Sequence, residues 1–488
     1  MIRAAAIALL AATASLLRFT PAFVLWRGLG IPAAASDPAL NRAADVLGQL
    51  RHPLSFIAAP NNRVIGWRLF FPLVGHGLAL PGWLYLSLPH VGCLLVLTLV
   101  ACLLLRHGSS NAEALAAATL AATCSWFFVS TAWLGYFDSW YILGLLVTVF
   151  AARWVMLAAI LVTPWIDERF VLTLPLCLLL RDRFLAATES PRSTRERWRE
   201  AGAAAAALLP WLLVRLGAYA AHRDAVSGAY VMGMTPGANA PFYGPGLWQG
   251  LRWGWMPAVA LVALEARGGW RRFALLLAGL ALTLAANLLA ANDLSRSVST
   301  MVPAMILGVL LLGLRLPRLL PPVLFLVCAL NLIFPAEHVV ASWTEPIHAF
   351  PVEVEHARHP PPALDPAYYT GAAAALNDQG DPRGALDLLD VALRLDPKDP
   401  AAYSNRAVSC YKLGRLAEAL AAADRAIELR PGFLEALYNR GIIRAAAGDF
   451  RGARDDLESA LRVAPGSWAA RAQAEAQLAA WRARAGSE

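Results

Sequence analysis

The stretch PAYYTGAAAALNDQGDPRGALDLLDVALRLDPKD (366–399) is followed without a gap by two more stretches of the same length and pattern. The second is PAAYSNRAVSCYKLGRLAEALAAADRAIELRPGF (400–433), and the third is LEALYNRGIIRAAAGDFRGARDDLESALRVAPGS (434–467). A fixed period of this length is typical of repeats in which each unit is one pair of helices. We therefore predict an α-solenoid of three stacked repeats over 366–467.

Particular residue types recur at fixed positions of the three stretches. Small residues are expected where paired helices approach closely, and a proline at the end of each unit cannot continue a helix. The recurring positions are Tyr369, Tyr403 and Leu437; Ala373, Ala407 and Gly441; Gly380, Gly414 and Gly448; the pairs Ala385/Ala392, Ala419/Ala426 and Ala453/Ala460; and Pro397, Pro431 and Pro465. In this pattern the region resembles tetratricopeptide repeats. Residues 468–488 are predicted to form an amphipathic helix that caps the last repeat.

The resemblance to tetratricopeptide repeats implies a concave groove lined by the first helix of each unit. Such a groove typically holds a peptide or helix of a partner protein. The alternative is that the repeats serve only for self-association. By repeat position, the groove-lining residues are Thr370, Asn377, Ser404, Tyr411, Lys412, Tyr438 and Ile442.

The rest of the chain has a composition typical of a membrane protein. The whole sequence is 58% hydrophobic and 16% charged, whereas soluble domains carry about 25% charged residues. We predict an all-α fold in which residues 1–335 form a polytopic helical bundle of about eleven spans. Three spans within 139–180 are short enough to be broken or re-entrant helices, and 64–80 is interfacial, re-entrant or a further span. A linker, 336–365, joins this bundle to the repeats.

The arginines predict the orientation of the bundle. The loops 181–200, 264–272 and 314–318 are arginine-rich, and such loops stay in the cytoplasm. The loop 221–246, the linker and the repeats then lie outside. Lys398 and Lys412 are the only lysines in an alanine-rich chain. This bias is typical of a GC-rich bacterial gene, which places the protein in a bacterial inner membrane with periplasmic repeats.

Charge and cysteine patterns disfavour two classes of function. The repeats 366–467 contain 14 acidic and 13 basic residues, so the net charge of +8 belongs to the membrane half. Because no basic run is interleaved with aromatic residues, nucleic acid is not an expected partner. The cysteines and histidines lack the spacing of metal ligands, so no metal site is predicted.

Charged residues recur at the predicted outer boundary of the membrane half. Ionisable groups are costly at the ends of apolar spans and therefore suggest a polar cavity. Simpler roles stay open: Asp37 and Asp138 as helix caps, a tight turn around 167–169, and a local ion pair between Asp293 and Arg296. The boundary residues are Asp37, Asp138, Asp167, Glu168, Arg169, Asp293 and Arg296.

This topology resembles GT-C-fold glycosyltransferases that use polyprenyl-phosphate sugars, some of which carry tetratricopeptide repeats. In that family a first-loop carboxylate acts as a base or orients the acceptor, and arginines hold the lipid phosphate. The resemblance implies Asp37 as the base candidate, then Asp138, with Asp167 and Glu168 as further catalytic candidates. Carboxylates suit proton transfer from a hydroxyl. The family usually has closely placed acids in its first loop, whereas this chain has Asp37 and Asp45.

Arg169 and Arg296 are the implied ligands of the donor phosphate, because arginine binds phosphate bidentately and stays charged. A polyprenyl-phosphate sugar would be the donor, and membrane lipids and a protein bound by the repeats would be the partners. A second function is a non-enzymatic, membrane-anchored tetratricopeptide scaffold for envelope or polysaccharide assembly. A transporter is less favoured, because residues 1–335 show no internal symmetry.

Overall fold

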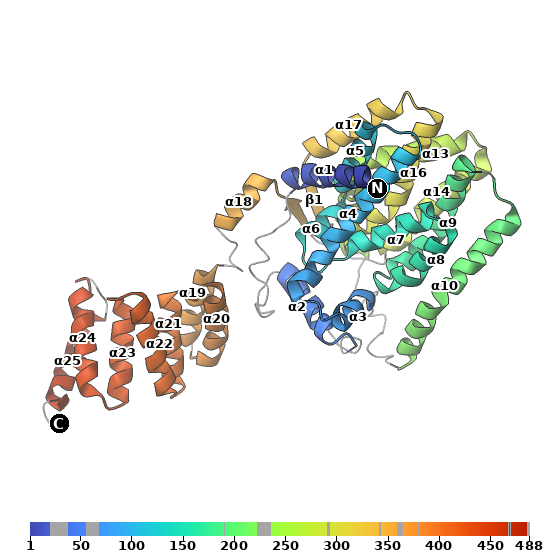
Figure 1. Ribbon diagram of the computed structural model, residues 1–488. Helices are drawn as coiled ribbons and strands as arrows, with labels where there is room; N and C mark the ends of the chain where they lie inside the picture. Colours follow the sequence, from blue (N-terminus) through green and yellow to red (C-terminus); the bar gives the residue numbers. More distant parts are fainter. Residues whose placement is uncertain are drawn as a thin grey trace. The chain divides into compact units, whose positions relative to one another are not determined.

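The protein, described by a computed structural model, forms two compact units (Figure 1). One unit comprises Met1–Phe23 and Asn41–Glu355, and the C-terminal unit includes His356–Glu488. The structure describes residues 1–19, 38–54, 68–189, 191–221, 236–289, 293–340, 343–358, 365–378, 380–466, 468 and 470–485.

The described chain is almost entirely α-helical, as the sequence predicts. The first unit contains α1 Ile2–Arg18, α2 Pro38–Arg51, α3 Phe70–Gly77, α4 Gly82–Arg106, α5 Asn111–Ala122, α6 Ser125–Ala132, α7 Asp138–Phe150, α8 Arg153–Val162, α9 Arg169–Thr188, α10 Thr194–Ala221, α12 Pro236–Leu251, α13 Trp255–Ala266, α14 Trp270–Leu289, α15 Leu294–Val298, α16 Val302–Arg315 and α17 Leu320–Ile333. Short 3-10 turns occur at η4 Thr163–Trp165, η5 Arg252–Gly254 and η6 Ser299–Met301.

Among the described residues, four helical segments are long and apolar enough to cross a membrane. A fifth would be α5 with α6, which are bent by 65° relative to one another. The prediction of about eleven spans therefore stays a prediction. The four segments are Gly82–Arg106, Thr194–Gly217, Trp270–Leu289 and Leu294–Arg315.

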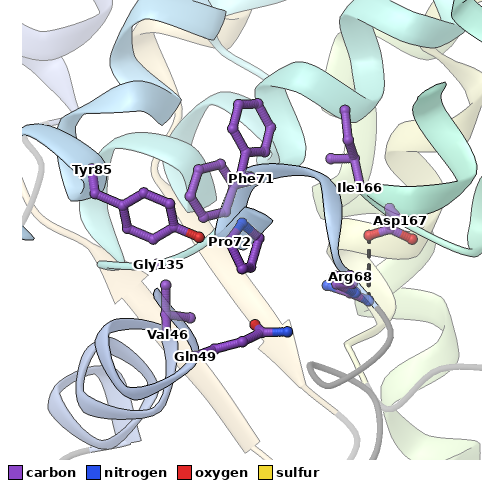
Figure 2. A pocket seen from close by; sticks show the side chains of 10 residues that line it. Val46, Gln49, Arg68, Phe71, Pro72, Tyr85, Gly135, Ile166 and Asp167 are labelled. Carbon is purple, nitrogen blue, oxygen red and sulfur yellow. Dashed lines mark ion pairs between the residues drawn. The ribbon is translucent and has the colours of Figure 1, made fainter. Parts of the chain in front are cut away.

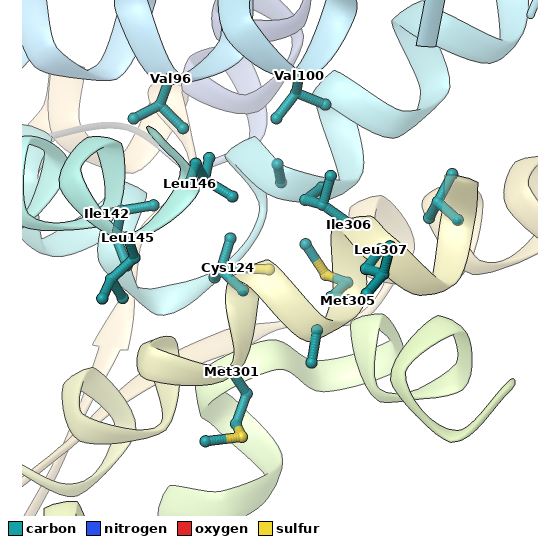
Figure 3. Packing of buried hydrophobic residues seen from close by; sticks show 14 of the residues in the cluster. Val96, Val100, Cys124, Ile142, Leu145, Leu146, Met301, Met305, Ile306 and Leu307 are labelled. Atoms are coloured by element: carbon teal, nitrogen blue, oxygen red, sulfur yellow. The ribbon is translucent and has the colours of Figure 1, made fainter. Parts of the chain in front are cut away.

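The core of the first unit is built around α16. Side chains of α4, α7 and η6 pack with those of α16 in one apolar cluster (Figure 3). Helices α13 and α16 approach so closely that a Cβ built on Gly308 would lie 1.9 Å from the Pro257 carbonyl oxygen. Small residues at such crossings allow helix backbones to come together. Gly308 therefore fixes how α13 lies against the core.

Two arginines hold the end of α17. The Arg18 guanidinium donates to the Leu332 and Ile333 carbonyls, and the buried Arg252 donates to the Phe334 carbonyl at 2.6 Å. The last carbonyls of a helix lack partners within the helix and carry partial negative charge, so cations stabilise them. These contacts explain how the buried Arg252 and the partly buried Arg18 are accommodated next to the end of α17.

A β-hairpin follows α17 within the predicted linker. Strand β1 (Ala336–Val340) pairs antiparallel with β2 (Trp343–Ile347) and contacts α12 and α15. His338 on β1 lies 3.4 Å from Asp293 and 3.1 Å from the Ser295 hydroxyl. Helix α18 (Phe350–Arg358) comes next. The hairpin is therefore held against the N-terminus of α15.

The repeats have helices at the same positions of each 34-residue stretch. Figure 1 shows these helices side by side in one row. Gly380, Gly414 and Gly448 all have positive φ, which glycine adopts without strain. Ala385, Ala419 and Ala453 are buried in the three units, and so are Ala392, Ala426 and Ala460, which lie seven residues, or about two helical turns, further along. The helices are α19 Pro366–Asp378, α20 Pro382–Leu395, α21 Pro400–Lys412, α22 Leu416–Leu429, α23 Leu434–Ala446, α24 Phe450–Val463 and α25 Arg471–Ala485.

The close approach at Gly308 leads to a stability prediction. Gly308→Ala should lower the free energy of unfolding by about 1–3 kcal/mol, because a methyl group forces the α13 and α16 backbones apart. The control is Gly202→Ala in α10, where a Cβ meets nothing within 4 Å. That change should raise helix stability by about 0.5–1 kcal/mol. Thermal unfolding of the purified protein in detergent measures both, and equal melting temperatures would contradict the packing argument.

Candidate functional site

Three arginines and three carboxylates meet at one end of the helical bundle. They come from the segment before α3, the start of α7, the turn before α9, the start of α9 and α15. We call them the ionic cluster. Its members are Arg68, Asp138, Asp167, Glu168, Arg169 and Arg296.

Asp138 uses only one of its carboxylate oxygens in the ionic cluster. Its Oδ1 accepts from Arg169 Nη2 at 2.7 Å and from Arg296 Nε at 2.6 Å. Its side chain is almost completely buried, and among the described residues its Oδ2 has no hydrogen-bond partner. A buried acceptor without a partner is costly. Oδ2 is therefore a buried acceptor whose hydrogen-bonding capacity is unused among the described residues.

Asp167 contacts all three arginines. Arg169 donates through Nε and Nη2 at 2.9 and 2.8 Å, and Arg296 donates through Nη2 at 3.2 Å. Arg68 Nη2 lies 3.4 Å from Oδ2. Burial alone would raise the pKa of Asp167, but the nearby positive charges outweigh burial and hold this pKa well below its usual range.

Most of these groups lie at helix N-termini, but only α15 has a side-chain cap. Neither α7 nor α9 has a side-chain cap hydrogen bond, so Asp138 is not the helix cap that the sequence allowed. Asp138 and Arg169 are the first residues of α7 and α9. Negative charge is stabilised at a helix N-terminus, and Asp167 Oδ1 also accepts from the Arg169 backbone N–H at 3.0 Å. Asp293 caps α15 by accepting from the Arg296 backbone N–H. Because that cap starts α15, the Arg296 side chain is brought to Asp138.

A narrow pocket lies beside the ionic cluster (Figure 2). Its cavity volume is about 20 Å³, which is room for about one water molecule. One wall is aromatic, with Phe71 stacked on Phe137 at 4.6 Å between ring centroids. Arg68 and Asp167 lie on the other side, and α2 contributes Gln49. The pocket thus joins an apolar surface to the ionic cluster.

The structure brings together most of the charged residues that the sequence singled out. Asp138, Asp167, Glu168, Arg169 and Arg296 all belong to the ionic cluster. The base candidate Asp37 lies outside the described residues.

The side chains of Asp293 and Arg296 do not form the local ion pair that the sequence allowed. The Arg296 side chain pairs with Asp138 and Asp167, and the Asp293 carboxylate lies against His338. Burial would raise the pKa of Asp293, but the His338 imidazole and nearby arginines lower it. Arg68 was not among the predicted site residues. Its position within the apolar stretch 64–80 was the signal that could have identified it.

Three of the predicted groove residues are buried between repeats. The Thr370 hydroxyl donates to Asp399 at 2.9 Å, and the Ser404 hydroxyl accepts from the Asn439 side chain at 3.1 Å. Asn377, also buried, donates to a carbonyl of the next repeat. These side chains stabilise the stacking of the repeats.

The other predicted groove residues are more accessible. Tyr411, Tyr438 and Ile442 are partly buried, and Lys412 is exposed, although its ammonium group donates to the Asn377 carbonyl at 2.5 Å. These four side chains are the ones that a partner could contact directly.

Comparison with known proteins identifies the repeats. Residues 370–432 match the tetratricopeptide repeat family model. No curated protein matches the chain. Residues 370–432 therefore form a tetratricopeptide-repeat domain, a type of solenoid with an extended binding surface for proteins.

Several solved structures are similar to this chain. The first TPR of Spaghetti (RPAP3) bound to the HSP90 peptide SRMEEVD is 22% identical and covers 25% of this chain and 94% of its own, with a TM-score of 0.23. The first TPR domain of the human RPAP3 protein is 23% identical, with coverage of 25% and 98% and a TM-score of 0.22. The yeast Sti1 TPR2AB-domain:pHSP90 complex is 13% identical, with coverage of 64% and 95% and a TM-score of 0.23.

The ionic cluster generates a prediction about stability. Arg169→Gln should lower the free energy of unfolding by about 3–5 kcal/mol, because removing this arginine leaves buried carboxylate charge uncompensated. Asp138→Asn should then lower the free energy of unfolding less in the Arg169→Gln variant than in the unmodified protein, since the two groups act as a pair. The control is Arg153→Gln, at an exposed position. Melting temperatures in detergent test this, and additive losses would contradict a shared network.

Proposed function

We propose that this protein is a multi-pass membrane protein that transfers a sugar from a polyprenyl-phosphate donor at the ionic cluster. In this proposal the tetratricopeptide repeats bind a protein partner or the acceptor. The observation that carries the proposal is the convergence of Arg68, Arg169 and Arg296 on buried carboxylates beside an aromatic-walled pocket.

Exposed apolar surface supports the membrane placement. The candidate spans in α10 and α14 have only 17% of their most apolar windows buried inside the protein. Leu213 and Leu282 are 66% and 71% exposed. Extended apolar surface of this kind is stable when lipid rather than water covers it.

The ionic cluster offers the groups that the reaction needs. In the transfer, the acceptor oxygen bonds to the anomeric carbon and the bond from that carbon to the phosphate oxygen breaks. Asp138 Oδ2 takes the acceptor proton, and the phosphate leaves with the bonding electron pair. Arginine stabilises that negative charge. Asp138 is assigned to the acceptor because its second oxygen lacks a partner among the described residues.

Arg68 is the arginine that a donor phosphate reaches first. It lines the pocket, and its partner Glu168 is the most accessible carboxylate of the ionic cluster, with 30% of its side chain exposed. A phosphate that displaces Glu168 from Arg68 would leave the buried contacts of Asp167 in place. Glu168 therefore acts as the exchangeable partner of the phosphate-binding arginine.

The second candidate is a non-enzymatic scaffold, which anchors the repeats in a bacterial inner membrane for envelope or polysaccharide assembly. It is favoured by the pairing of every arginine of the ionic cluster with a carboxylate. In this case the ionic cluster only fixes the bundle, and function depends on the repeats alone.

Two variants separate these candidates. Arg68→Gln should weaken retention of undecaprenyl phosphate, measured by native mass spectrometry, by about 10–100-fold, because a charged hydrogen bond contributes about 1.5–3 kcal/mol. Asp138→Asn should retain the lipid but lose release of sugar from an undecaprenyl-phosphate-sugar. The control is Arg318→Gln, at an exposed position. If Arg68→Gln retains the lipid and Asp138→Asn releases sugar no less than the control does, the sugar-transfer proposal is wrong and the scaffold is favoured.

The orientation has its own test. A cysteine placed by Arg451→Cys in α24 should react with a membrane-impermeant maleimide in intact spheroplasts, because the repeats are proposed to be periplasmic. Arg195→Cys, which the structure places in the first turn of α10 and not in the predicted loop 181–200, should react only after lysis. Both positions are exposed. The reverse labelling pattern would place the repeats in the cytoplasm.

A further inference from the structure

A second group of ion pairs lies at the opposite end of the bundle from the ionic cluster. Helix α7 starts at Asp138, and at its other end Arg181 donates to the Ala151 carbonyl at 2.6 Å. Thirteen helical residues span about 20 Å. Arg181 also pairs with Glu200 of α10 at 2.9 Å. This end therefore gathers the last turn of α7 and the first turns of α10.

Further ion pairs bring α13 and α16 to the same end. Glu265, near the end of α13, pairs with Arg183 of α9 at 3.4 Å and with Arg315 at the end of α16 at 3.1 Å. Because Trp270 starts α14 directly after that turn, α14 also begins here.

Three highly exposed tryptophans lie within a few residues of these ion pairs. Trp154, Trp198 and Trp270 are 78%, 74% and 74% exposed. Trp154 and Trp270 lie in the first turns of α8 and α14, and Trp198 lies in the second turn of α10. Tryptophan carries a large apolar surface with one polar N–H, and it is enriched where lipid meets water.

Arginines accompany all three tryptophans. Arg153 lies over the Trp154 ring at 5.9 Å. Arg199 directly follows Trp198 and Arg195 lies three residues before it, whereas Arg271 and Arg272 directly follow Trp270; all four arginines are exposed. At the other end, the exposed Trp83 at the start of α4 has no arginine near it in the sequence. Exposed arginines therefore accompany the exposed tryptophans at this end but not Trp83.

We propose that this arginine–tryptophan collar, formed by Trp154, Trp198, Trp270, Arg195, Arg199, Arg271 and Arg272, binds acidic phospholipid headgroups. The inference rests on the membrane placement proposed above and adds a lipid requirement. Arginine binds phosphate bidentately, and basic residues at a membrane surface are attracted by anionic lipids. Because the four arginines and three tryptophans of the collar are exposed, lipid headgroups reach them without rearrangement of the protein.

The experiment uses the full-length protein reconstituted with a mixture of phosphatidylglycerol and phosphatidylcholine. The collar variant carries Arg195→Gln, Arg199→Gln, Arg271→Gln and Arg272→Gln. Retained lipids are counted by native mass spectrometry. The unmodified protein should retain mostly phosphatidylglycerol, and its enrichment should fall by roughly fivefold for each arginine replaced.

The control makes the same change of charge in the repeats, with Arg383→Gln, Arg394→Gln, Arg451→Gln and Arg462→Gln at exposed positions. It should keep the enrichment. Equal retention of both lipids by the unmodified protein, or equal loss in the control, would overturn the proposal. Displacement of the lipid by inorganic phosphate would also overturn it, because the site would then recognise a soluble anion.

The collar can fail without affecting the sugar-transfer proposal. Collar variants leave the ionic cluster and its pocket unchanged, so donor binding should persist in them. Conversely, loss of donor binding in Arg68→Gln should leave phosphatidylglycerol retention intact. The two proposals are therefore tested by separate variants and separate lipids.

Discussion

Charge buried in an apolar bundle has to be neutralised where it lies, and this constraint organises the proposed site. Asp167 touches Arg68, Arg169 and Arg296, which belong to three different segments of the chain. Each of these segments can be buried here only if another segment places an oppositely charged side chain next to its own. A shift of one of these segments relative to the others would leave a buried charge without a partner, which is strongly destabilising.

Helix α7 links this constraint to the far end of the bundle. Its N-terminus carries Asp138 and its last carbonyls accept from Arg181, so both ends match the helix dipole. Arg181 in turn holds Glu200. The geometry of the proposed site and the position of the collar thus depend on one short helix.

The sequence predicts the repeats well and the ionic cluster only in part. The turn between the two helices of each repeat follows from Gly414 and its equivalents, because each adopts a positive φ that favours glycine. The charged residues could be found because they interrupt apolar segments. Their pairing could not, since Arg296 and Asp138 lie 158 residues apart and only tertiary structure brings them together. Asn377 shows a similar limit in the repeats. Its repeat position predicts that it lines the groove, but not that its side chain is buried and donates to a carbonyl of the next repeat.

Charge balance also bears on which ligand the site accepts. The ionic cluster contains equal numbers of arginines and carboxylates, and Glu168 is its most accessible carboxylate. A neutral ligand that displaced Glu168 would leave Arg68 with only the longer contact to Asp167. A phosphate in the same place restores the lost negative charge and the bidentate contact. The same pairing that supports a purely structural role therefore favours an anionic ligand over a neutral one, which is the property that a phosphate-linked donor requires.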